Sequence, residues 1–173
     1  SLESGDGTEP FVWQGRTFHA RKAALEAFDA TFREAAKHQV VVSAILLVAN
    51  PAKSSDPVVK RLGHPDATAQ GVYAMPNVTN EEGIALYGAI LNLMAERWSR
   101  PDGKYGRVHH WILHNEVDAG RVWTNAGNPP DTVFMDLYQR SLRLMGLIAA
   151  THDPHSRPFI SLTHHWAKPG EPG

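Results

Sequence analysis

Residues 108–117, VHHWILHNEV, form the stretch that decides the fold of this chain. Its apolar centre, Trp111-Ile112-Leu113, runs directly into the polar pair Asn115-Glu116. Continuous apolar strands are typical of parallel sheets that are covered on both faces, and chemistry in such folds lies at the carboxyl ends of the strands. The stretch therefore predicts a buried strand that ends in candidate functional residues.

Two other stretches of similar character lie on either side of it. Residues 40–48, VVVSAILLV, are apolar on both faces and rich in β-branched side chains at their start, and residues 158–163, PFISLT, form a third predicted strand. A helical pattern precedes each strand, at residues 20–38, 79–98 and 131–148, with apolar side chains at spacings of three and four. This alternation of helix and strand predicts parallel strands joined by right-handed crossovers.

The start of the chain has a different pattern. Residues 1–10 are polar and acidic and predict a flexible lead-in, and residues 11–20 alternate around Gln14-Gly15, which predicts a tight β-hairpin. Residues 52–77 and 118–130 are polar and aperiodic, as functional loops often are. We expect residues 1–173 to belong to a single domain.

Two α/β architectures fit the alternation of helices and strands. No glycine-rich phosphate loop follows a predicted strand, which weakens the doubly wound nucleotide-binding fold. A complete (β/α)₈ barrel needs about 250 residues. We therefore expect a fragment of a larger domain, a partial (β/α)₈ TIM barrel with about strands 3 to 5 and their helices, plus the small hairpin. The remainder of the barrel is then required as a partner.

The composition excludes several classes of partner. The 173 residues carry a formal net charge of −1, without the basic excess of a nucleic-acid-binding protein. There is no cysteine, and no apolar run approaches the roughly 20 residues that span a bilayer. We expect no nucleic acid partner, no membrane span and no cofactor. A secreted or periplasmic location is favoured over a cytoplasmic one.

Glu116 is the candidate catalytic residue. Glycoside hydrolysis needs a carboxylic acid that protonates the leaving oxygen, and the adjacent amide of Asn115 could orient a sugar hydroxyl. A glutamate after a strand is also often a solvated loop group or an ion-pair partner. Further candidates for substrate binding, by aromatic stacking or hydrogen bonding, follow the second and third strands: Trp123, Asn125, His164, His165 and Trp166. A buried loop anchor or a capped strand would explain these five residues equally well.

The strand that ends in Asn115-Glu116 resembles the fourth strand of the clan A glycoside hydrolases. The ordered set of stretches in this chain is similar to a bacterial domain-of-unknown-function family with a glycosidase-like TIM barrel. These stretches are residues 11–20, 42–47, 95–99, 115–117, 123–125 and 160–166. The resemblance implies that Glu116 is the acid/base, that Asn115 orients the carbohydrate substrate, and that the nucleophile lies outside this chain. Thr163 departs from the pattern, because relatives are expected to have an acidic residue there.

Three functions remain open at this stage. The first is a glycoside hydrolase-like protein that works through Glu116. The second is a non-catalytic carbohydrate-binding barrel, which is motivated by Thr163 and by the absence of a second catalytic carboxylate. The third is a metal-dependent hydrolase that uses histidines such as His110 and His114, although the spacing assigns no metal ligands.

Overall fold

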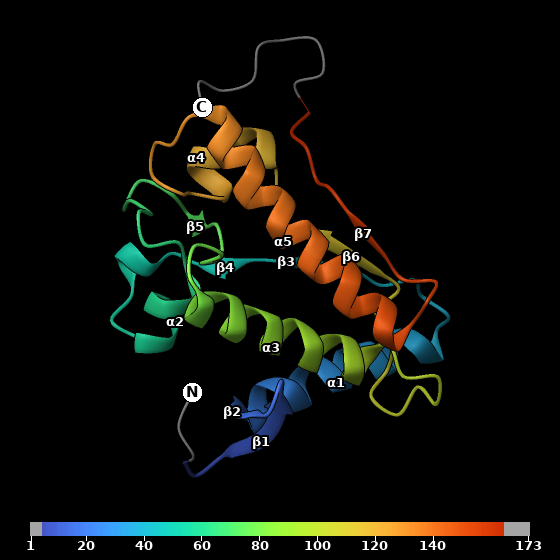
Figure 1. The fold of residues 1–173 in the computed structure, drawn as a ribbon. Helices are drawn as coiled ribbons and strands as arrows, with labels where there is room; N and C mark the ends of the chain where they lie inside the picture. Colours follow the sequence, from blue (N-terminus) through green and yellow to red (C-terminus); the bar gives the residue numbers. More distant parts are fainter. Residues whose placement is uncertain (1–4, 165–173) are drawn as a thin grey trace.

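A three-stranded parallel sheet organises the computed structural model, which describes residues 5–164 (Figure 1). Its strands are β3 (Ser43–Leu46), β6 (His110–Leu113) and β7 (Arg157–Phe159), in that spatial order. Ser43 pairs with His110, and His110 pairs with Arg157, so the three strands start level with one another. Their carboxyl ends therefore meet at one edge of the sheet.

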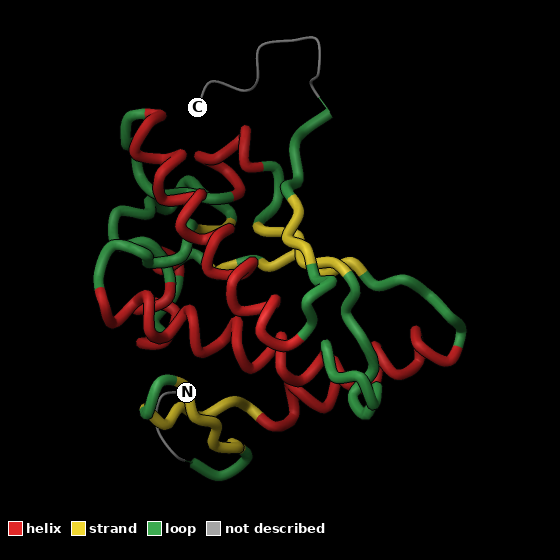
Figure 2. Tube along the Cα trace, turned by 45° about the vertical axis from the view of Figure 1, so that its right-hand side comes forward, coloured by secondary structure: helices red, strands yellow, loops and turns green. Residues whose placement is uncertain are grey.

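A long helix precedes each strand of this sheet, as the sequence predicts. These are α1 (Lys22–Lys37), α3 (Glu81–Trp98) and α5 (Asp131–His152). Helices α3 and α5 pack against each other and lie together on one side of the sheet (Figure 2). The predicted order of helix and strand, and the parallel strand direction, are both confirmed.

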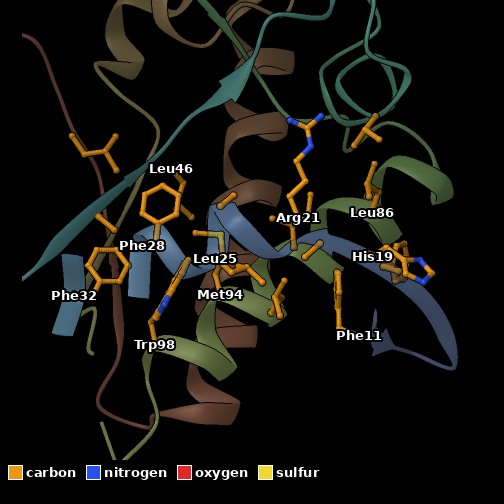
Figure 3. A pocket seen from close by; sticks show the side chains of 18 residues that line it. Phe11, His19, Arg21, Leu25, Phe28, Phe32, Leu46, Leu86, Met94 and Trp98 are labelled. Atoms are coloured by element: carbon orange, nitrogen blue, oxygen red, sulfur yellow. The ribbon is translucent and has the colours of Figure 1, made fainter. Parts of the chain in front are cut away.

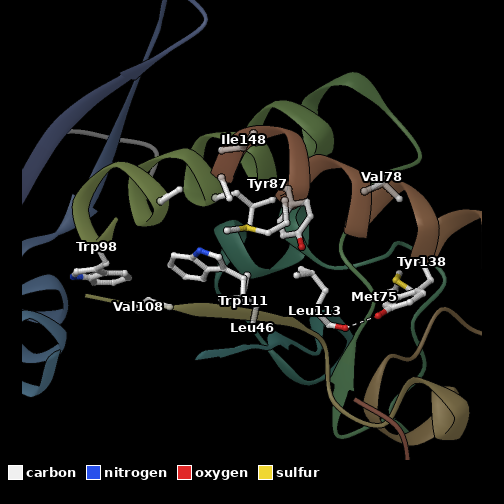
Figure 4. Close-up of a cluster of buried hydrophobic side chains, with 14 of the residues drawn as sticks. Leu46, Met75, Val78, Tyr87, Trp98, Val108, Trp111, Leu113, Tyr138 and Ile148 are labelled. Carbon is white, nitrogen blue, oxygen red and sulfur yellow. Dashed lines mark hydrogen bonds between the residues drawn. The ribbon is translucent and has the colours of Figure 1, made fainter. Parts of the chain in front are cut away.

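The core lies between the sheet and helices α3 and α5 (Figure 4). Trp111 and Leu113 project into it from β6 and are fully buried, because alternate residues of a strand point to the same face. Tyr87 from α3 and Tyr138 from α5 are buried against them. The Tyr138 hydroxyl donates a hydrogen bond of 2.8 Å to the carbonyl of Leu113, which ties α5 to the end of β6.

The opposite face of the sheet differs from expectation. Ile45 and Phe159 share this face with Ile112, and they are 45% and 43% exposed. The expectation that residues 40–48 are buried on both sides is wrong for the described part of the chain, because no helix of residues 5–164 covers this face. Strand β3 is also shorter than predicted, and Val40 and Val41 are exposed.

The N-terminal hairpin is confirmed. Strands β1 (Thr8–Trp13) and β2 (Arg16–Arg21) are antiparallel, and the turn residues Gln14 and Gly15 have φ values of 47° and 75°. Two consecutive positive φ values are what a two-residue hairpin turn requires. Strand β1 begins at Thr8, within the predicted lead-in.

The two predicted loops contain short elements. Strand β4 (Val48–Ala49) and a 3₁₀ turn (Pro51–Lys53) lead into the first loop, which includes α2 (Pro57–Leu62) and β5 (Tyr73–Ala74). A 3₁₀ turn (Val117–Ala119) leads into the second loop, which includes α4 (Gly120–Trp123). Strands β3 and β7 are the free edges of the parallel sheet, so residues 5–164 form an open α/β layer and no closed barrel. None of the helices described in this range is long and apolar enough to cross a membrane.

A buried ion pair joins the hairpin, α1 and α3. The Arg97 guanidinium donates to both carboxylate oxygens of Asp29, at 2.9 and 2.7 Å, and to Glu9 at 3.2 Å. Trp98 Nε1 also donates to Asp29 at 2.9 Å, and the Arg97 guanidinium stacks 3.9 Å from the ring centroid of Tyr105. Burial raises the pKa of the Asp29 carboxyl, but the hydrogen bonds from Arg97 and Trp98 outweigh it, so the pKa lies below its ordinary value.

Candidate functional site

The backbone turns sharply where β6 ends. His114 has φ = 60° and Glu116 has φ = 41°, so two non-glycine residues on either side of Asn115 adopt the left-handed conformation. This conformation costs roughly 1–2 kcal/mol for each L-residue other than glycine. Such strain is concentrated at functional sites and persists only where surrounding contacts hold it. The Asn115-Glu116 pair therefore lies in a strained turn at the carboxyl end of β6.

His114 is the anchor of this turn and lies in the core. Its Nδ1 donates to the carbonyl of Leu46 at 2.9 Å, because a carbonyl can only accept. Its Nε2 then accepts from the hydroxyl of Ser141 at 2.8 Å, and Ser141 accepts in turn from the Tyr87 hydroxyl at 2.8 Å. Burial lowers the pKa of His114 to about 4, against the smaller opposing effect of the Leu46 hydrogen bond.

Both members of the Asn115-Glu116 pair are half-buried and contact the segment after β7. The Ser161 hydroxyl lies 3.5 Å from Asn115 Oδ1, and the backbone N–H of Glu116 donates to the same hydroxyl at 3.4 Å. The N–H of Val117 donates to the Ser161 carbonyl at 3.1 Å. The sheet thus brings the segments after β6 and β7 together around Glu116, the predicted acid/base, and Asn115, the predicted substrate-orienting residue.

A second carboxylate, which the sequence analysis did not single out, lies at the same edge. The backbone N–H of Thr163 donates to Asp118 Oδ1 at 2.9 Å, and the Thr163 hydroxyl donates to Oδ2 at 2.5 Å. Thr163, where the sequence resemblance predicts an acidic residue, thus contacts the carboxylate of Asp118 from the loop after β6. No local signal could reveal this pair, because its members are 45 residues apart in the chain.

Trp123 and Asn125 hold the loops beside this edge. The ring of Trp123 stacks on Tyr73 with a centroid distance of 6.1 Å, and Trp123 is half-buried. Asn125 is buried, its Oδ1 accepts from the backbone N–H groups of Thr68 and Gly127, and its Nδ2 donates to a backbone carbonyl. In this structure the Asn125 amide faces the backbone of the two loops.

The remaining candidates lie at the end of the described chain. His164 is exposed and follows Thr163, while His165 and Trp166 fall outside the described residues. Within residues 5–164, no group of three or more His, Asp or Glu side chains is placed to hold a metal ion. An apolar hollow of about 330 Å³ is lined by the hairpin, α1, α3 and β3, with neither Glu116 nor Asn115 among its lining residues.

The strain at position 116 can be measured. We expect Glu116→Gly to leave the free energy of unfolding nearly unchanged, because the relief of left-handed strain offsets the greater flexibility of the unfolded chain. We expect Glu116→Val to lower it by about 1–2 kcal/mol, since a β-branched residue fits this conformation poorly. Urea unfolding measures the stability of both variants. Equal stability of the two would contradict a strained left-handed backbone at position 116.

Comparison with known proteins identifies one relationship. A family model described as "Family of unknown function (DUF5722)" matches residues 1–173. No curated protein and no solved structure matches the chain.

Proposed function

We propose that this chain, which belongs to the DUF5722 family of unknown function, is part of a glycoside hydrolase-like (β/α)₈ barrel with Glu116 as the acid/base. One observation carries the proposal. The Asn115-Glu116 pair sits in a strained turn at the carboxyl end of the central strand of a parallel sheet. In (β/α)₈ enzymes the catalytic residues come from the ends of the strands on this face.

The open sheet supports the barrel part of the proposal. Helices α3 and α5 cover one face, while the other face presents Ile45, Ile112 and Phe159 in one row across the three strands. In a (β/α)₈ barrel such rows fill the interior in layers of branched and bulky side chains, and the helices lie outside. The remaining strands and helices of the barrel would then cover this face and both free edges.

The chemistry follows from the two side chains at the turn. Glu116 would protonate the glycosidic oxygen as the bond breaks, and Asn115 would hydrogen-bond a hydroxyl of the neighbouring sugar. His164, and His165 and Trp166 beyond the described residues, would bind the same carbohydrate. A retaining mechanism needs a second carboxylate about 5 Å from the first. This nucleophile would come from a part of the barrel outside this chain.

A non-catalytic carbohydrate-binding barrel is the second candidate, and one contact favours it. The carboxylate of Asp118 accepts two hydrogen bonds from Thr163, so the acidic group at this position ties two loops together. A barrel that binds sugar without cleaving it needs such rigid loops and needs no acid. The carboxyl edge of the sheet would then select a carbohydrate through Asn115 and the aromatic side chains.

Hydrolysis of a panel of 4-nitrophenyl glycosides by the full-length protein tests the proposal. We expect Glu116→Gln to lower kcat by a factor of about 100 or more, because general acid catalysis contributes on the order of 10²–10⁴. Glu96→Gln, which alters an exposed glutamate of α3, is the matched control and should keep the wild-type rate. Equal turnover by wild type and Glu116→Gln would contradict the role of Glu116 as the acid/base. Saturable sugar binding without turnover would support the non-catalytic carbohydrate-binding barrel.

A further inference from the structure

The ring of His114 does not lie on the face of the sheet where strand alternation would place it. Trp111 and Leu113 of β6 enter the core, so the next residue in the alternation would join Ile112 on the open face. The His114 ring is instead 1% exposed, and its Nε2 lies 2.8 Å from the hydroxyl of Ser141 in α5, on the core side. The left-handed backbone of His114, with φ = 60°, accompanies this reversal.

This ring ties the end of β6 to three other elements. Its Nδ1 donates at 2.9 Å to the carbonyl of Leu46, the last residue of β3. Its Nε2 accepts from Ser141 of α5, and Ser141 accepts at 2.8 Å from Tyr87 of α3. Because burial lowers the pKa of His114 to about 4, the ring is neutral at pH 7, and Nε2 keeps the lone pair that this chain of hydrogen bonds requires.

The anchored ring lies two residues before Glu116. Only Asn115 separates the two, and Glu116 is itself left-handed, with φ = 41° and ψ = 60°. A change in the backbone at His114 therefore reaches the Glu116 carboxylate through a few dihedral angles. A displacement of about 1 Å in a catalytic group can lower the rate on the order of 10²-fold.

We propose that His114 is a positioning residue, whose anchored ring sets the turn that presents Asn115 and Glu116 at the carboxyl edge of the sheet. The consequence for catalysis rests on the proposed function, in which Glu116 is the acid/base. If the ring only filled the core, an apolar side chain of similar size would replace it and would avoid burying polar atoms. A positioning residue needs the hydrogen bond to Leu46 and the left-handed backbone as well.

Two substitutions of His114 separate these roles. His114→Asn keeps a side-chain N–H on the side of Nδ1, toward the Leu46 carbonyl, and asparagine tolerates the left-handed conformation better than most residues do. His114→Leu fills much of the same space but has no donor and disfavours this conformation. The matched control is Leu25→Ala, because Leu25 is a buried core residue of α1 that lines the apolar hollow (Figure 3). It weakens the core by leaving a cavity and keeps the hydrogen bonds of His114.

The first measurement reports the backbone at Glu116 and requires no activity. In full-length protein labelled with ¹⁵N-glutamate, the NOE between the N–H and Hα protons of Glu116 is strong at positive φ, because the two protons then lie close together. We expect a strong NOE in wild type, His114→Asn and Leu25→Ala. In His114→Leu the NOE should fall to the level of glutamates with negative φ.

The second measurement is the hydrolysis of a 4-nitrophenyl glycoside that the full-length wild type cleaves. We expect His114→Leu to lower kcat about tenfold or more, and to change kcat more than KM, because a misplaced acid acts on the transition state. His114→Asn should restore kcat to within about threefold of wild type. Leu25→Ala should keep the wild-type kcat.

Several outcomes would overturn the inference. A strong Glu116 NOE with wild-type kcat in His114→Leu would show that an apolar residue suffices, and equal losses in His114→Asn or Leu25→Ala would show a general loss of stability. If His114→Leu does not fold, Ser141→Ala, which removes the donor to Nε2, takes its place, and an unchanged NOE and kcat would again overturn the inference. A wild type that cleaves no glycoside contradicts the proposed function alone, because the NOE still decides the role of His114.

Discussion

Replacing Arg97 by methionine is expected to lower the free energy of unfolding by about 3–5 kcal/mol, the range observed when one partner of a buried ion pair is removed. The Asp29 side chain is 4% exposed, so without Arg97 its charge stays buried with the Trp98 N–H as its remaining described donor. The substitution also removes the guanidinium from the face of Tyr105 and from Glu9. Urea unfolding measures the loss.

Two further variants serve as controls for Arg97→Met. Arg100→Met removes an exposed pair with Asp102 and should lower the free energy of unfolding far less than Arg97→Met does, because solvent screens an exposed pair. The double variant Asp29→Leu/Arg97→Met removes both charges and should recover part of the stability, since the uncompensated carboxylate is then gone. A cost below about 1 kcal/mol for Arg97→Met alone would show that the pair does not hold the hairpin, α1 and α3 together.

Acidification from pH 7 to pH 4 is expected to cost roughly 3 kcal/mol of stability through His114 alone. The folded pKa of His114 is about 4, against an ordinary value of 6.5. Between these pH values the unfolded chain binds a proton that the folded chain rejects, so protonation favours unfolding. The stability from the neutral, buried ring is complete above pH 6.5 and is lost as the pH falls toward 4.

The variant His114→Gln isolates this contribution. Its amide can replace some of the hydrogen bonds of His114 but does not titrate, so its own cost is independent of pH. The difference in unfolding free energy between wild type and His114→Gln should therefore shrink by roughly 3 kcal/mol between pH 7 and pH 4. The lowered pKa values of His64 and His109 act in the same direction in both proteins and cancel in this difference. A constant difference across this range would contradict the buried neutral imidazole.

The local pattern of the chain was sufficient for the order of elements. Periodicity placed the three long helices, and the Gln14-Gly15 pair placed the hairpin turn, because both depend on residues within a few positions of each other. The same local reasoning placed Asn115 and Glu116 at the carboxyl end of a parallel strand. The sequence also predicted helix-covered strands, but it could not show that one face of the sheet is open within residues 5–164.

The sequence alone therefore established the alternation of helix and strand and the position of Glu116 after a buried strand, because backbone periodicity is a local property. Tertiary structure alone decided which groups meet. It paired Asp118 with Thr163, Asp29 with Arg97 and His114 with Ser141. These partners are separated by 27 to 68 residues, and no periodic pattern encodes such contacts. They form only when the sheet and helices pack, and two of them involve His114 and Asp118, which lie on either side of Glu116 in the chain.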